Sequence, residues 1–245
     1  MNNKTHLIIT GGHSGIGKMI VDHYIDKVLK ITIIDKKKIK SKKADFIYTD
    51  LSKIVKIKKL INKNNFSFEK IIIINAAVHR LKKKVMKESQ SDLNQAFSIS
   101  ASSPFILFKN VISHAIKRQV QCKYINIGSV LDNLISPDQS ASYHFAKSSA
   151  LNLVKLFSIF FMSKYFSSVS IKIGYFEKGK NNKKSLKIKS RYLSLVNRSP
   201  LFNFNNLAEV INLIINSKNN YLNGSEIVVD HGVSNIEQFH LFNKI

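Results

Sequence analysis

The sequence predicts an α/β fold: a doubly wound parallel sheet in a single domain covering residues 1–245. A short apolar strand, His6–Ile9, leads into a glycine-rich turn, and apolar residues at helical spacing follow the turn. The run Lys70–Ile74 has the β-branched pattern of a parallel strand buried on both faces. Strand and helix patterns then alternate roughly six times without a break in composition, so we expect no linker and no second domain.

Composition bears on the class of partner. The chain carries a formal net charge of +24, which first suggests a nucleic-acid protein. The basic residues are 35 Lys and only 4 Arg, and they are spread along the chain. Because Arg is the better residue for phosphate and base contacts, we do not expect nucleic-acid binding as the main function. The charge still favours anionic ligands.

Location and metal content can also be addressed from the sequence. No apolar run approaches the ~20 residues that cross a membrane. Met1 lies so close to the first strand that we expect no signal peptide. Cys122 is the single cysteine, which fits a reducing cytoplasm. The histidines show no spacing typical of metal ligands, so we expect no metal site.

The turn Thr10–Gly17 reads T-G-G-H-S-G-I-G. A strand, a glycine turn and a helix in this order form a phosphate-binding corner, because the helix N-terminus offers N–H groups and a partial positive charge. Gly11, Gly15 and Gly17 let the backbone turn sharply and approach a pyrophosphate. His13 lies inside the turn, where it contacts the cofactor or faces solvent.

The second strand, Val28–Ile34, ends at Asp35. A carboxylate roughly 20 residues beyond the glycines accepts hydrogen bonds from ribose hydroxyls and repels a 2′-phosphate, which favours NAD(H) over NADP(H). Lys36, Lys37 and Lys38 follow directly and could instead hold that phosphate. We expect the basic run 36–43 to be a solvated loop.

Acidic and amide residues follow the next two strands. After the strand Asp45–Tyr48, Asp50 either caps the following helix or contacts adenine. The strand Lys70–Ile74 ends in Asn75-Ala76-Ala77, and the carboxyl ends of parallel strands face the ligand crevice.

The remaining expected elements are a helix from Asp92 to about Lys117, a strand Lys123–Ile127, a helix after Pro137 to about Phe166, a strand Val169–Ile173, a loop Glu177–Asn206, a helix Leu207–Ser217 and a strand Ser225–Asp230.

Tyr143 and Lys147 are four residues apart on one helix face. A free tyrosine has a pKa near ~10, but a nearby ammonium favours the phenolate and makes the residue a useful proton donor and acceptor. Ser129 ends the preceding strand at the same edge of the sheet and could hydrogen-bond a substrate oxygen. A Tyr and a Lys four residues apart occur by chance in a Lys-rich chain, so this spacing alone is weak evidence for a catalytic pair. The preceding strand that ends in Ser129 and the glycine-rich turn near the N-terminus strengthen the interpretation.

In this order the motifs resemble those of the classical short-chain dehydrogenase/reductase family. They are the turn at 10–17, Asp35, Asp50-Leu51, Asn75-Ala76-Ala77, I-N-I-G-S-V at 125–130, Tyr143-x-x-x-Lys147 and Y-L-N-G-S-E-I-V-V-D-H-G at 221–232. The resemblance implies a Rossmann-type sheet and an NAD(H)-dependent oxidoreductase that interconverts an alcohol and a ketone. It implies a homodimer or homotetramer, commonly formed through the two long helices.

The resemblance also implies the site residues. The catalytic residues would be Ser129, Tyr143, Lys147 and Ser100. The cofactor would be held by Gly11, His13, Ser14, Gly15, Ile16, Gly17, Asp35, Asp50, Leu51, Asn75, Ala76, Ala77, Tyr143, Lys147 and Gly174. Lys147 would bind the nicotinamide ribose.

The chain departs from the family pattern close to the expected cofactor and substrate. Ser100 aligns with the family's catalytic Asn, and Asn94 is a less convincing candidate. The other departures are Ala77 for Gly, Ile173 for Pro, Lys178 for Thr and His231 for Gly. Two alternatives to the main interpretation remain. One is a 3-oxoacyl-[acyl-carrier-protein] reductase using NADPH, and the other is a non-catalytic dinucleotide-binding protein.

Overall fold

The computed structural model describes residues 4–37, 43–53, 68–79, 81, 83–136, 139–176, 203–218 and 220–235. Seven strands form one sheet in the order β3-β2-β1-β4-β5-β6-β7, and all neighbouring pairs are parallel. The strands are β1 (Thr5–Thr10), β2 (Lys30–Asp35), β3 (Asp45–Tyr48), β4 (Lys70–Asn75), β5 (Gln121–Ser129), β6 (Phe166–Ile173) and β7 (Ser225–Val229). The order reverses between β1 and β4, which confirms the predicted doubly wound, Rossmann-type sheet.

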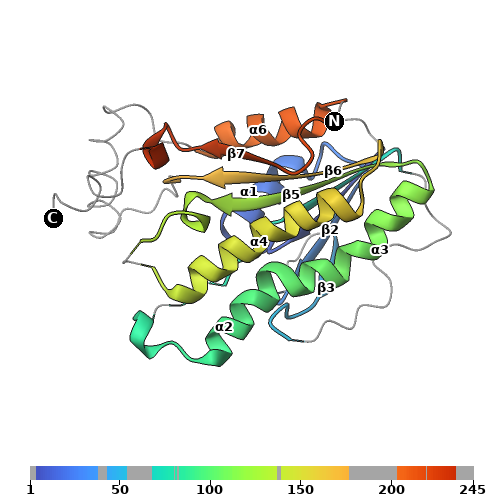
Figure 1. Ribbon diagram of the computed structural model, residues 1–245. Helices are drawn as coiled ribbons and strands as arrows, with labels where there is room; N and C mark the ends of the chain where they lie inside the picture. Colours follow the sequence, from blue (N-terminus) through green and yellow to red (C-terminus); the bar gives the residue numbers. More distant parts are fainter. Residues whose placement is uncertain are drawn as a thin grey trace.

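Helices cover both faces of this sheet (Figure 1). They are α1 (Gly15–Tyr24), α2 (Gln90–Phe97), α3 (Ser103–Lys117), α4 (Ala141–Phe160) and α6 (Phe204–Asn216). Leu7 and Ile9 of β1 belong to the core under α1 and α6, whereas Ile8 belongs to the core under α3 and α4. Both faces of β1 are therefore buried, which explains its unbroken apolar run.

The expected strands are present, with shifted ends. β2 begins at Lys30 rather than Val28, and Leu29 is exposed just before it. β4 extends to Asn75, and the four isoleucines of that strand are fully buried. β5 and β6 are longer than predicted because they pair over eight residues, from Cys122 opposite Phe166 to Ser129 opposite Ile173.

The helical segment predicted from Asp92 to about Lys117 is present without a break, but it is not one regular α-helix. A π-helix, Ser98–Ser102, separates α2 from α3. The hydroxyls of Ser98 and Ser103 both donate to the carbonyl of Leu51, each at 2.8 Å. Residues five apart face different directions on a regular α-helix, and the wider π-turn brings both hydroxyls to one carbonyl.

Two further boundaries differ from the prediction. The helix expected to reach Phe166 ends at Phe160, because Phe166 is the fully buried first residue of β6. The loop expected to reach Asn206 ends earlier, because Asn203 caps α6 by accepting hydrogen bonds from the N–H groups of Asn205 and Asn206. The expected helix after Asp50, Pro137 and most of the 177–206 loop lie outside the described residues.

Within the part of the chain that the structure describes, no helix is both long enough and apolar enough to span a membrane.

His6 links the fold to pH. Burial, with the charge of Lys30, lowers the pKa of His6 to about 4, while Asp45 acts in the opposite direction. The unfolded chain therefore binds this proton first as the pH falls, and the folded state loses stability between pH of about 6.5 and 4. The contribution of His6 to this loss is about 3 kcal/mol.

We expect His6→Gln to make the free energy of unfolding less dependent on pH in this range, because the residue that titrates differently in the two states is gone. Urea unfolding at a series of pH values measures this slope. A slope equal to that of the wild type would show that His6 does not cause the acid sensitivity.

Candidate functional site

The glycine-rich turn joins the end of β1 to the start of α1. Ser14 is the extended N-cap residue of α1, and its exposed side chain makes no capping hydrogen bond. The first turn of α1 contains no acidic residue. Among the described residues, no side chain accepts from the first N–H groups of α1, where the helix dipole concentrates positive charge.

Two glycines of this turn are required by close backbone contacts. Gly11 has φ +73°, and a Cβ atom there would lie 2.7 Å from the Cα of Ala77. A Cβ atom on Gly17 would lie 2.2 Å from the carbonyl oxygen of Gly11. The turn thus packs on itself and against the end of β4, leaving bare backbone at this point. Gly15 also has a positive φ, and Ile16 is half-buried.

Asp35 connects the end of β2 to this turn. Its Oδ2 accepts a hydrogen bond from the backbone N–H of His13 at 3.0 Å, and its Oδ1 accepts from the N–H of Lys37 at 3.1 Å. The predicted ribose-binding carboxylate therefore lies beside the predicted phosphate-binding turn. An ionised carboxylate has about four acceptor positions, so it can accept further hydrogen bonds.

Asp50 and Leu51 follow β3. Asp50 Oδ1 accepts from the backbone N–H and the hydroxyl of Ser52, at 3.0 and 2.8 Å. Burial raises the pKa of Asp50, but these hydrogen bonds and the charges of Lys36 and Lys53 outweigh it and lower the pKa. Leu51 is buried, and its carbonyl holds the π-helix in place, as described above.

A row of buried polar side chains crosses the sheet near the carboxyl ends of the strands. Thr10, Asn75, Asn126 and Ser170 lie opposite one another on β1, β4, β5 and β6. Thr10 donates to Asn75, Asn75 to Asn126, and Asn126 to Ser170, at 2.8, 3.4 and 3.1 Å. Thr10 Oγ1 also accepts from the N–H of Ala77, and the N–H of Ala76 donates to the Thr10 carbonyl. This row fixes the Asn75–Ala77 segment against the turn.

Ser100 lies buried in the π-helix beside this row. Its backbone carbonyl accepts a hydrogen bond from Asn75 Nδ2 at 3.3 Å. Asn94, the other candidate for this position, is exposed on α2. The structure thus brings Ser100, and not Asn94, to the edge of the sheet.

Ser129, Tyr143 and Lys147 gather around the end of β5. Ser129 is its last residue, is buried, and accepts a hydrogen bond from the N–H of Leu131 at 3.2 Å. Lys147 Nζ donates to the carbonyl of Ile127 at 2.8 Å, two residues before Ser129. The same ammonium lies 5.9 Å from the centre of the Tyr143 ring. Lys147 therefore lies between the strand that ends at Ser129 and the Tyr143 ring.

Comparison with known proteins shows the family of the chain. The family model described as Enoyl-(Acyl carrier protein) reductase matches residues 13–234. The chain belongs to the short-chain dehydrogenase/reductase family. This is a family of oxidoreductases, and the predicted enzyme class is confirmed. A search of curated proteins found no match.

Solved structures of this family share the fold. A short-chain dehydrogenase from Bacillus anthracis str. 'Ames Ancestor' has a TM-score of 0.80 and 19% identity, covering 96% of this chain and 98% of that one. For 4-hydroxyisoleucine dehydrogenase complexed with NADH the TM-score is 0.75 and the identity 20%, over 93% and 97% of the two chains. For ElxO with NADP bound these values are 0.74 and 20%, over 94% and 98%.

The structure describes some of the positions at which the chain departs from the family's sequence pattern. Ile173 is the buried end of β6, and the N–H of Gly174 donates to the carbonyl of Val229 at 3.1 Å. His231 has φ +57°, a backbone conformation that favours glycine. Lys178 lies outside the described residues.

Glu88, which was not predicted as a functional residue, places its carboxylate at the start of α4. Glu88 accepts hydrogen bonds from the backbone N–H groups of Ala141 and Ser142, at 2.7 and 2.9 Å. Burial raises the pKa of Glu88, but hydrogen bonds from Ser142 and Ala141 outweigh it and lower the pKa. Glu88 belongs to a different segment from α4, so no local sequence pattern identifies it. It fixes the helix turn that carries Tyr143.

His144 was also missed as a structural residue. Its Nδ1 lies 2.9 Å from the carbonyl oxygen of Leu131, and its Nε2 lies 3.3 Å from the carbonyl oxygen of Ser136. It ties the segment after Ser129 to α4. Among the described residues, no group of three His, Cys, Asp or Glu side chains could hold a metal ion.

We expect Glu88→Ala to lower the free energy of unfolding by about 1–2 kcal/mol, because two N–H groups at the start of α4 lose a charged acceptor. Chemical denaturation measures the change. Lys87→Ala, at the exposed neighbouring position, is the matched control and should have little effect. Equal losses in the two variants would contradict the capping role of Glu88.

Proposed function

We propose that the chain is an NAD(H)-dependent dehydrogenase or reductase that interconverts an alcohol and a ketone. The observation that carries the proposal is the position of Lys147, which binds the carbonyl of Ile127 two residues before Ser129 and lies beside the Tyr143 ring, on the same sheet edge as the glycine turn. A bound nicotinamide dinucleotide would supply or accept the hydride. The chain's own residues would bind it, hold the substrate oxygen and move the proton.

The turn fits a dinucleotide. Added Cβ atoms on Gly11 and Gly17 would strike backbone, so at these two positions the turn has only main chain beside a ligand. The N–H groups at the start of α1 suit a pyrophosphate, because they combine unpaired donors with the positive end of the helix dipole. Asp35 would hold the adenosine ribose, and Asn75, Ala76 and Ala77 would line the crevice next to it.

Tyr143 would act as the general acid and base. The ammonium of Lys147 lies on the same helix face and favours the phenolate, because an opposite charge nearby stabilises the ionised form. During reduction the Tyr143 hydroxyl would donate its proton to the carbonyl oxygen of the substrate, while Ser129 would hold that oxygen by a hydrogen bond. During oxidation the phenolate would take the proton back.

Lys147 and Ser100 would complete the site. Lys147 would bind the nicotinamide ribose, in addition to its contact with the carbonyl of Ile127. Ser100 would contribute through its hydroxyl at the position that aligns with the family's Asn. The backbone carbonyl of Ser100 accepts a hydrogen bond from Asn75, which supports a position of Ser100 at the edge of the site.

A second candidate function is reduction of a 3-oxoacyl thioester on acyl carrier protein with NADPH. The description of the matching family model names an acyl-carrier-protein reductase. The net charge of +24 would suit an acidic carrier. Asp35 argues against NADPH, because a carboxylate repels the 2′-phosphate. Turnover of an acetoacetyl thioester with NADPH, but not with NADH, would favour this candidate.

A homo-oligomer is the partner we propose. Large apolar side chains are exposed along α4 and just beyond its end, at Phe145, Leu156, Ile159, Phe160 and Met162. Exposed apolar surface of this kind supports a contact between copies of the chain.

We expect Tyr143→Phe to lower kcat by ~10²-fold or more while NADH binding stays unchanged, because the ring remains and only the transferable proton is lost. Steady-state assays over a panel of small ketones measure kcat, and nicotinamide fluorescence measures binding. Tyr221→Phe, at an exposed position, is the control. Turnover close to the wild-type value in Tyr143→Phe would refute the assignment.

We expect the wild-type protein to bind NADH at least about tenfold more tightly than NADPH, a difference of roughly 1.4 kcal/mol. Asp35→Asn should narrow this ratio, because it removes the charge and keeps an oxygen that can accept from His13. Fluorescence titration with both cofactors measures the ratio. A wild-type preference for NADPH would mean that the lysines at 36–38 override Asp35.

A further inference from the structure

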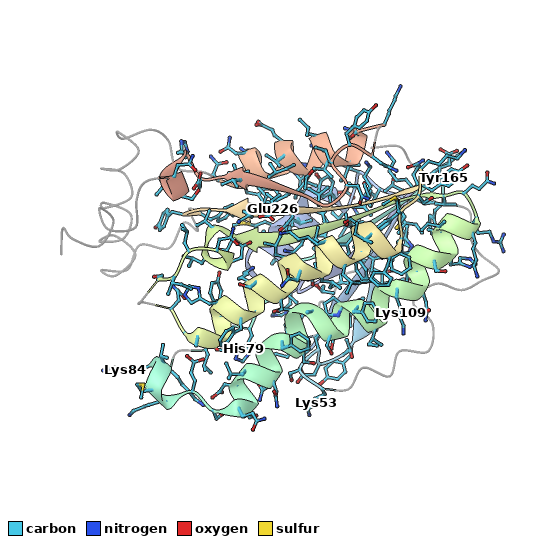
Figure 2. The ribbon with its side chains drawn as sticks, in the orientation of Figure 1. Lys53, His79, Lys84, Lys109, Tyr165 and Glu226 are labelled. Carbon is cyan, nitrogen blue, oxygen red and sulfur yellow. The ribbon has the colours of Figure 1, made fainter. Side chains whose placement is uncertain are left out.

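Four charged side chains form a chain of ion pairs close to Ser129. Lys172 Nζ lies 2.8 Å from Asp132 Oδ1 and 3.1 Å from Glu226 Oε2, and Lys155 Nζ lies 2.9 Å from Glu226 Oε1. The side chain of Asp132 is 0% exposed and that of Lys172 is 6% exposed. Figure 2 labels Glu226, which lies on β7 beside α4. Two cations and two anions thus balance, with Asp132 and Lys172 buried and Lys155 exposed.

Two members of this chain of ion pairs, Lys172 and Asp132, lie close to the proposed catalytic residues. Lys172 is opposite Gly128, the residue before Ser129, and Asp132 follows Ser129 by three positions. The Asp132 carbonyl accepts a hydrogen bond from the hydroxyl of Ser148, the residue after Lys147, at 2.7 Å. Any movement of Asp132 would therefore be transmitted to both Ser129 and Lys147.

Charged groups on three elements act on Asp132. They are Lys147 on α4, Lys172 on β6 and Glu226 on β7. Lys155, also on α4, pairs with Glu226, and the His144 ring contacts the carbonyl of Leu131, the residue before Asp132. Burial raises the pKa of Asp132, and Lys172 and Lys147 act against this increase. Burial lowers the pKa of Lys172, but hydrogen bonds and charge from Asp132 and Glu226 outweigh it and raise the pKa. The charges of two lysines thus act on Asp132, and Lys172 is the one that lies in ion-pair contact with it, at 2.8 Å.

A buried carboxylate that loses its counter-charge is strongly destabilised. Besides Lys172, the cation whose charge acts on Asp132 is Lys147. In the structure Lys147 instead donates to the carbonyl of Ile127 and faces the ring of Tyr143. The contact between Lys172 and Asp132 therefore gives Asp132 a counter-charge that does not come from Lys147.

We propose that Lys172 is a positioning residue that neutralises Asp132 and so keeps the ammonium of Lys147 directed at Tyr143. This inference rests on the proposed function, in which Lys147 favours the Tyr143 phenolate. Glu226 holds Lys172 from the other side, and Lys155 balances Glu226 at the partly exposed end of the chain of ion pairs.

The test is the ionisation of Tyr143 in the full-length protein without substrate. Tyrosinate absorbance is followed against pH, and the same background carrying Tyr143→Phe is subtracted to isolate the one residue. In Lys172→Met, Asp132 should attract Lys147, so Tyr143 should ionise at higher pH, with an ionisation constant about tenfold smaller. The double variant Asp132→Asn/Lys172→Met should restore the wild-type value.

Asp132→Asn alone should shift the ionisation of Tyr143 in the opposite direction. This variant tests the proposal even where Lys172→Met does not fold. It removes the competing anion while Lys172 keeps Glu226, so Tyr143 should ionise at lower pH than in the wild type. General damage to the fold would move both single variants in the same direction. Lys155→Met, at the distant end, is the control and should leave the ionisation of Tyr143 unchanged.

The two proposals fail in different ways. If Tyr143 of the wild type ionises like an ordinary phenol, the proposed function itself is contradicted. If Tyr143 ionises early in the wild type but Lys172→Met and Asp132→Asn leave it unchanged, the role of Lys172 is overturned and the proposed function stands.

Discussion

The site depends on the buried polar row that links β1, β4, β5 and β6. Thr10, Asn75, Asn126 and Ser170 lie opposite one another and are joined by hydrogen bonds. A shift of one residue between two strands would turn these side chains to the other face and leave buried polar groups unpaired. The row therefore fixes how far each strand extends, and with it the position of the turn after β1 and of Ser129 at the end of β5. The proposed cofactor-binding turn and the proposed catalytic Ser129 are therefore both positioned by the register of β1, β4, β5 and β6.

The second requirement is the attachment of α4 to that edge. Lys147 and Ser148 contact backbone carbonyls of the β5 end and of the segment after it, and His144 contacts the same segment. Glu88 caps the helix from the connector that follows β4. His79 and Lys84 lie toward this end of the sheet, whereas Lys109 and Tyr165 lie at the opposite end (Figure 2). Contacts from three segments thus hold the first two turns of α4, and a general acid and base needs this kind of fixed geometry.

The sequence was sufficient where a feature has a local cause. Buried strands such as β4 follow from continuous β-branched runs, and the turn at 10–17 follows from its glycines, so the fold class and the main site candidates could be predicted. The π-helix could not, because it arises where Ser98 and Ser103 meet the carbonyl of a residue about fifty positions earlier. Lys172 and Asp132 are forty positions apart, and in a chain with 35 lysines nothing distinguishes a buried one. Pairings of this kind are determined by the sheet register.

The most direct measurement of the central claim is a crystal structure of the protein with NADH. The account predicts a dinucleotide along the carboxyl edge of β1, β4 and β5, with its pyrophosphate at the turn 11–17, its adenosine ribose at Asp35 and its nicotinamide ribose at Lys147. A dinucleotide bound at another place, or one whose nicotinamide lies away from Tyr143 and Ser129, would contradict it.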